Sequence, residues 1–208
     1  MTNPEADNGG KTRDELVQRL ELMEAMIAEG RRSTNRCGWI FVVWGVVDIA
    51  GMAWEWFRPS YWIWPTVLTV GFVLFFLIRA TQKQDPLRCA NSEGRTIGAI
   101  WSMMGLAAVL YVGTGIFRHL AWQYSFIAGI FMLIGLAHAI SATVLRWRVQ
   151  GLVAALWWAG GIAMFFAHGD KQIFVVFPLE MFFGMVLFGL YGMMLDRRDR
   201  SGLKGARA

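Results

Sequence analysis

The chain has 208 residues, of which 56% are hydrophobic and only 17% are charged, and its mean hydropathy is +0.42. This composition excludes an ordinary soluble domain, in which about a quarter of the residues are charged. The length leaves no room for a large soluble domain beside several membrane spans. We therefore expect an all-α integral membrane protein that crosses the inner (cytoplasmic) membrane of a bacterium several times.

The N-terminal part is polar and divides into two segments. Residues 1–11 show no periodicity and are predicted to be a disordered arm. Residues 12–35 are predicted to form a cytosolic amphipathic helix, because Thr12 and Glu15 have the spacing of a capping box. The apolar residues that follow at heptad spacing are Leu16, Leu20, Met23 and Ile27.

This helix is too short to be stable alone, because two heptads are marginal for an isolated coiled coil. Residues 12–30 therefore need a surface, which is the protein's own bundle, a second copy, another protein or the lipid headgroups. Acidic residues on the polar face argue against anionic lipid and favour the bundle or a second copy. The pattern thus predicts a homo-oligomer or protein contact in this region.

Six apolar segments follow, each close to the roughly 20 residues that a helix needs to cross a bilayer. They are residues 37–57, 61–78, 97–117, 121–145, 151–167 and 172–195. We predict a six-helix transmembrane domain over residues 36–196, arranged as three tandem hairpins. A basic cytosolic tail, residues 197–208, completes the chain.

Basic residues are distributed unevenly among the joints between these segments. The first, third and fifth loops between spans hold one each, namely Arg58, Arg118 and Lys171, and the other Lys and Arg residues lie in the remaining joints and tails. By the positive-inside rule, this predicts that both termini face the cytosol.

The three hairpins share a pattern that indicates an internal repeat. Each opens with an Arg shortly before a Gly, and each second helix has a Gly followed by large apolar residues. The glycines of the second helices are Gly71, Gly129 and Gly184. The alternative is that any glycine-rich membrane sequence aligns with itself in this way.

The first span contains an unexpected residue near its middle, Asp48. A charged side chain at this depth costs about 3 kcal/mol unless it is partnered or neutralised. On a helix it shares a face with Gly45, Met52 and Glu55, and Glu55 is expected at the outer interface. We interpret Asp48 either as a proton or cation site or as a hydrogen-bonded carboxyl that fixes helix packing.

Two further polar residues complete the candidate intramembrane site, Glu180 and His138. Glu180 follows Pro178, which suits the first turn of a helix but not its interior, so the sixth span is predicted to begin at Pro178 or to kink there. Asp48 and Glu180 fall at similar depth, where they would share a proton or one cation. His138 lies on a face of small residues and is expected to be a packing residue.

Motifs of familiar enzyme chemistry are missing from the sequence. There is no Walker loop, HExxH, GxSxG or CxxC motif. His119 and His168, at the outer ends of their helices, supply too few ligands for a metal or haem site. We therefore predict no catalytic activity, no cofactor, no metal and no nucleic-acid partner.

Two functions remain from this reading. We favour a non-catalytic scaffold or sensor-type partner protein, in which the N-terminal helix transmits or receives a contact. The alternative is a small proton- or cation-coupled carrier that uses Asp48 and Glu180.

Overall fold

The fold is that of a computed structural model, which describes residues 4–81, 92–118, 124–167 and 169–205. This part of the chain is all-helical and has no strand. Apolar segments of this length become helices in lipid, because a helix satisfies every backbone N–H and C=O group without water.

The elements are assigned in chain order as follows. They are α1 (Pro4–Arg36), α2 (Gly38–Phe57), α3 (Ile63–Thr81), α4 (Ser92–Phe117), α5 (Tyr124–Val144), α6 (Arg148–Phe165), α7 (Asp170–Glu180), the π-helix η2 (Met181–Leu187) and α8 (Phe188–Gly205).

Several of the helices are long and apolar enough to span a membrane. Among the described residues, five helical stretches are long and apolar enough to do so, namely Glu15–Phe57, Ile63–Thr81, Thr96–Gly115, Ser125–Val144 and Lys171–Asp199. The predicted fifth span corresponds to α6, which has 18 residues and lies outside this group. The structure therefore contains five or six helices of spanning length.

The N-terminal helix is longer than predicted at both ends. It begins at Pro4, ahead of the expected start at Thr12, and a proline suits a first helical position because its missing N–H has no intrahelical partner there. At the other end α1 runs almost directly into α2, with only Cys37 between them. The amide of Cys37 donates to the carbonyl oxygens of Ser33 and Thr34, at 3.2 and 3.1 Å.

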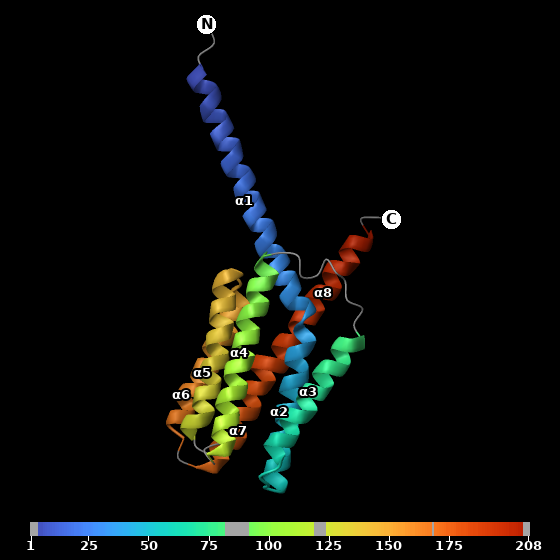
Figure 1. Cartoon of the computed structure of the whole chain (residues 1–208), viewed down its shortest axis with the longest axis vertical. Helices are drawn as coiled ribbons and strands as arrows, with labels where there is room; N and C mark the ends of the chain where they lie inside the picture. The colour runs from blue at the N-terminus through green and yellow to red at the C-terminus, as the bar shows by residue number, and fades with distance from the viewer. Residues whose placement is uncertain (1–3, 82–91, 119–123, 168, 206–208) are drawn as a thin grey trace.

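The helices of the bundle lie side by side beneath α1, which projects beyond them toward the N terminus (Figure 1). Helix α2 packs against η2 and α8, α5 packs against α6, and α3 lies against α2 at the edge. A close approach joins Gly38 of α2 to Gly189 of α8, where a β-carbon on either residue would collide with the carbonyl oxygen of the other. Small residues thus allow backbones to meet, as in other membrane bundles.

The core lies where α5 and α6 face α7 and η2. The rings of Phe131 and Trp157 are fully buried and meet edge to face, with centroids 5.2 Å apart. Phe177 of α7 and Met52 of α2 close the same cluster. The most extensive helix contact joins α5 to α6, which belong to different predicted hairpins, so the tandem repeat stays a prediction.

Pro178 lies inside α7, which begins at Asp170, so the prediction that the sixth span starts at Pro178 is wrong. Regular α-helix ends two residues later, at Glu180, and the chain continues as the π-helix η2. A proline inside a helix removes one hydrogen bond and crowds the preceding turn. The wider turns of η2 follow directly after this disturbance.

Candidate functional site

Glu180 is held deep in the bundle by α6. The residue is 5% exposed, and its carboxylate lies against Gly160, where a β-carbon would collide with it. The indole of Trp157, one turn before Gly160, lies in the same way over Gly184 of η2. We call Trp157, Gly160, Glu180 and Gly184 the Glu180 cluster.

Two polar atoms in the Glu180 cluster have no hydrogen-bond partner among the described residues. They are Oε2 of Glu180 and Nε1 of Trp157, and both are buried. The described residues contain eight other buried side-chain atoms without a partner, so this feature is shared with other parts of the core. What sets the Glu180 cluster apart is the adjacent π-helix, since π-helical turns occur frequently at functional sites.

Asp48 lies on α2 and is only half-buried. Gly45, one turn before it, faces the carbonyl oxygen of Met181, the residue that follows Glu180. The two acidic residues therefore sit on packed helices, but the carboxylate of Glu180 is directed at Gly160 of α6. No described hydrogen bond or ion pair joins Asp48 to Glu180, and their pairing stays a hypothesis.

His138 is completely buried among aromatic rings at the other end of the core. The rings of Trp101, Phe188 and Phe41 lie 4.9, 5.1 and 5.7 Å from its imidazole, centroid to centroid. Neither ring nitrogen has a hydrogen-bond partner within the described part of the chain. The contacts of His138 come from α2, α4 and α8, whereas those of Glu180 come from α6, so the structure gives the two residues separate surroundings.

Glu55 is a buried residue that the sequence analysis placed at an exposed interface. It is 4% exposed, and its Oε2 has no hydrogen-bond partner among the described residues. The chain reverses direction just after it, between Phe57 and Ile63, and Ile63 is completely buried. Glu55 thus lies in the last turn of α2, at the end of the span where it was expected, but its side chain is buried there.

Arg31 links the base of α1 to the end of α5. Its Nε donates to the carbonyl oxygen of Leu145 at 2.7 Å, and its Nη2 donates to that of Arg146 at 2.5 Å. The last carbonyl groups of a helix have no partners inside the helix. Arg31 supplies donors and a positive charge at the place where the helix dipole favours a cation.

The turn that Arg31 holds has an unusual backbone. Arg146 adopts a φ of 48°, a left-handed conformation that glycine normally occupies after a helix. The amide of Trp147 donates to the carbonyl oxygen of Ala142 at 2.9 Å, and that of Arg146 donates to Thr143 at 3.3 Å. These two bonds form a Schellman motif, which ends α5 and turns the chain into α6.

Ion pairs join α1 to α8 at the same level. Arg36 pairs with Asp196 at 3.4 Å, and Arg32 pairs with Asp199 at 3.6 Å. Both arginines also approach Glu29, at 3.8 and 3.9 Å. We call Arg31, Arg32 and Arg36 with these partners the clamp. The sequence analysis described residues 197–208 only as a basic tail and did not predict these pairs.

Above the clamp, the apolar face of α1 is left uncovered. Leu16, Leu20 and Met23 are 55%, 60% and 48% exposed, and Ile27 is half-buried. We call these four residues the stripe. The same helix face is buried further down at Gly30 and Thr34. The protein's own bundle therefore does not cover the upper part of the stripe, which removes one of the surfaces considered for it.

A metal or haem site finds no support in the described residues, since they contain no group of three or more His, Cys, Asp or Glu side chains that would hold a metal. The side chains of His119 and His168, considered for such a site, lie outside the residues that the structure describes.

Comparison with known proteins gives no match among protein-family models, curated proteins or solved structures. The fold defines a class, a helical bundle with five or six helices that could span a membrane and a long helix that projects from it. Within that class, the functional argument rests on the chain's own geometry.

Proposed function

We propose that the protein is a non-catalytic membrane scaffold or sensor-type partner protein. Its projecting helix α1 carries a contact between the membrane bundle and a cytosolic protein or a second copy. The observation that supports this most strongly is the clamp, which fastens α1 to α5 and α8 at the point where it leaves the bundle.

The clamp makes α1 an extension of the bundle. A loosely attached helix would move independently, and a contact at its tip would have no effect on the membrane part. Here α1 is nearly continuous with α2, and its base is held by two hydrogen bonds and by ion pairs to α8. Displacement of the stripe would therefore pull directly on two membrane helices.

The clamp also supports the topology that we propose, with both termini in the cytosol of a cell with an inner membrane. It brings the C-terminal end of α1, the α5–α6 turn and the C-terminal half of α8 to one level of the bundle. These are three of the joints in which basic residues gather, and the positive-inside rule places such joints on the cytosolic side.

Site-specific photo-crosslinking tests the scaffold proposal. A photoreactive amino acid replaces Leu20, in the stripe, and in a control replaces Leu22, which is 65% exposed on another face of α1. We expect position 20 to crosslink in intact cells to one defined protein or to a second copy, and position 22 not to do so. Equal products from both positions, or none from position 20, would contradict the proposal.

A carrier is the second candidate, favoured by the buried carboxylate of Glu180 beside the π-helix. In this case Glu180 or Asp48 takes up a proton or another cation at mid-membrane. Proteoliposomes with a pH-sensitive dye inside measure the flux after a pH jump. A carrier would lose this flux in Glu180→Gln or Asp48→Asn, and wild-type vesicles as tight as protein-free ones would eliminate the idea.

A further inference from the structure

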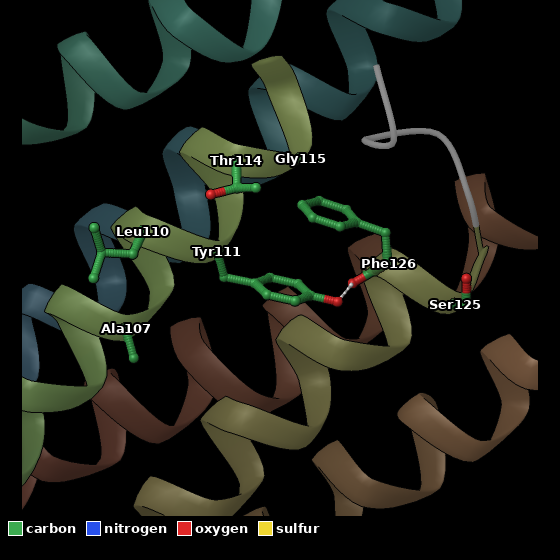
Figure 2. Close-up of a pocket in the computed structure, with 7 residues that line it drawn as sticks. All are labelled: Ala107, Leu110, Tyr111, Thr114, Gly115, Ser125 and Phe126. Atoms are coloured by element: carbon green, nitrogen blue, oxygen red, sulfur yellow. Dashed lines mark hydrogen bonds between the residues drawn. The ribbon is translucent and has the colours of Figure 1, made fainter. Parts of the chain in front are cut away.

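A pocket opens between α4 and α5, at the end of the bundle opposite the clamp (Figure 2). It has a volume of about 630 Å³ and is open along one side, as a groove on the surface of the bundle. Its lining is mainly apolar, and the lining residues are Ala107, Leu110, Tyr111, Thr114, Gly115, Ser125 and Phe126.

Two stacked aromatic rings form one wall of the pocket, between α4 and α5. Tyr111 of α4 stacks on Phe126 of α5, with ring centroids 4.6 Å apart and planes 4° from parallel. The hydroxyl of Tyr111 donates to the carbonyl oxygen of Phe126 at 3.3 Å. Each ring lies over a glycine of the opposite helix, Gly129 and Gly115 respectively, where a β-carbon would collide with it.

The pocket belongs to a helix face that is exposed outside the bundle. Leu106, Val109 and Leu110 of α4 are 53%, 47% and 62% exposed. In a membrane-spanning helix, such a surface contacts hydrocarbon instead of water. Residues 107, 111 and 114 follow one another along this side of α4 for about 10 Å, at 1.5 Å per residue.

We propose that this pocket binds one acyl chain of a phospholipid, from the leaflet opposite the clamp. The small side chain of Ala107 leaves room for the chain at the end nearer the middle of α4. Thr114 and Ser125 lie in the last turn of α4 and the first turn of α5, and their hydroxyl groups mark the other end. The ester oxygens of a phospholipid lie at this level, where a hydroxyl donates to them.

The surrounding lipid determines which interactions can favour binding of an acyl chain in the pocket. Moving an acyl chain from lipid to an apolar pocket yields no hydrophobic gain, because both surroundings are hydrocarbon. Binding therefore depends on close packing against the Tyr111–Phe126 pair and on hydrogen bonds from the hydroxyl groups. The proposal is independent of α1 and of the scaffold function, since it uses only α4 and α5.

Photolabelling with a phospholipid probe tests the proposal. The full chain is reconstituted in phosphatidylethanolamine vesicles that contain a phospholipid with a diazirine near the end of one acyl chain. Ala107→Phe fills the end of the pocket away from the hydroxyl groups, and Val109→Phe places the same side chain on the exposed face outside the pocket. We expect label on the peptides that contain residues 107–115 and 125–126 to fall about tenfold in Ala107→Phe, equivalent to about 1.4 kcal/mol, and to stay unchanged in Val109→Phe.

Two results would overturn the proposal: equal labelling of both variants, or label spread evenly over all exposed helices. Melting midpoints show whether each variant is folded. Should Ala107→Phe unfold, Leu110→Trp blocks the pocket from its rim and is expected to give the same loss. Thr114→Val, which keeps the shape and removes the hydroxyl, should reduce the phospholipid retained in native mass spectrometry.

Discussion

Replacing Arg31 by alanine removes the only described side chain that caps the end of α5, and the neighbouring arginine offers a matched control. Arg31 donates two hydrogen bonds to backbone carbonyls, whereas Arg32 makes ion pairs at 3.6 and 3.9 Å with a side chain that is 50% exposed. Both substitutions remove the same charge from adjacent positions of one helix. They differ in what the guanidinium group contacts.

The expected magnitudes follow from burial. The bond to Leu145 is partly buried, and a hydrogen bond that involves a charged group contributes about 1.5–3 kcal/mol. The bond to Arg146 is exposed, so water replaces much of it. We therefore expect Arg31→Ala to cost about 2 kcal/mol in free energy of unfolding. Exposed ion pairs contribute about 0–1 kcal/mol. We therefore expect Arg32→Ala to cost at most about 1 kcal/mol in free energy of unfolding.

Thermal unfolding in a mild detergent measures the difference. For a chain of this size, 1 kcal/mol shifts the midpoint by about 2–4 °C, so Arg31→Ala should lower it by about 4–8 °C. Added salt should reduce the small effect of Arg32→Ala, since salt screens exposed charges. Equal shifts for the two variants, or no shift for Arg31→Ala, would refute the assignment of Arg31 as the cap of α5.

Further substitutions test other contacts by the same unfolding measurement. Gly189→Ala should cost about 1–3 kcal/mol, because its methyl group would collide with a carbonyl oxygen of α2, whereas Gly98→Ala, with nothing near it, should be neutral. Gly160→Ala should destabilise the wild type more than the Glu180→Ala variant, and a double-mutant cycle without coupling would contradict the Glu180 cluster. Arg146→Gly should stabilise by about 1 kcal/mol by relieving the left-handed backbone, and destabilisation would show that its side chain matters more.

The spanning helices were predictable because hydropathy is a local property of the sequence. Each of the six predicted segments contains a helix, or most of one, in the described residues. The N-terminal helix was predicted to end at residue 35, and α1 ends at Arg36. Its last turns contact the bundle, where Gly30 is buried and Arg31 is bonded to a distant turn.

The clamp could not be found from the sequence, because its partners are far apart along the chain. Arg31 and Leu145 are separated by 114 positions, and no local pattern marks a backbone carbonyl as an acceptor. The surroundings of Glu180 were equally hidden. A signal for them did exist in Gly160 and Gly184, since small residues in membrane helices often mark places where another group approaches closely.

The near-continuity of α1 and α2 has a consequence for angular position. Together they extend for about 80 Å at 1.5 Å per residue, and roughly 30 Å of this is enough to cross the hydrocarbon core. Along an unbroken helix, the direction in which a residue points is set by its distance from a fixed reference, at about 100° per residue. The clamp is such a reference. One residue inserted between the stripe and Arg31 would turn the stripe by more than a quarter of a circle, whereas seven would return it nearly to its original direction.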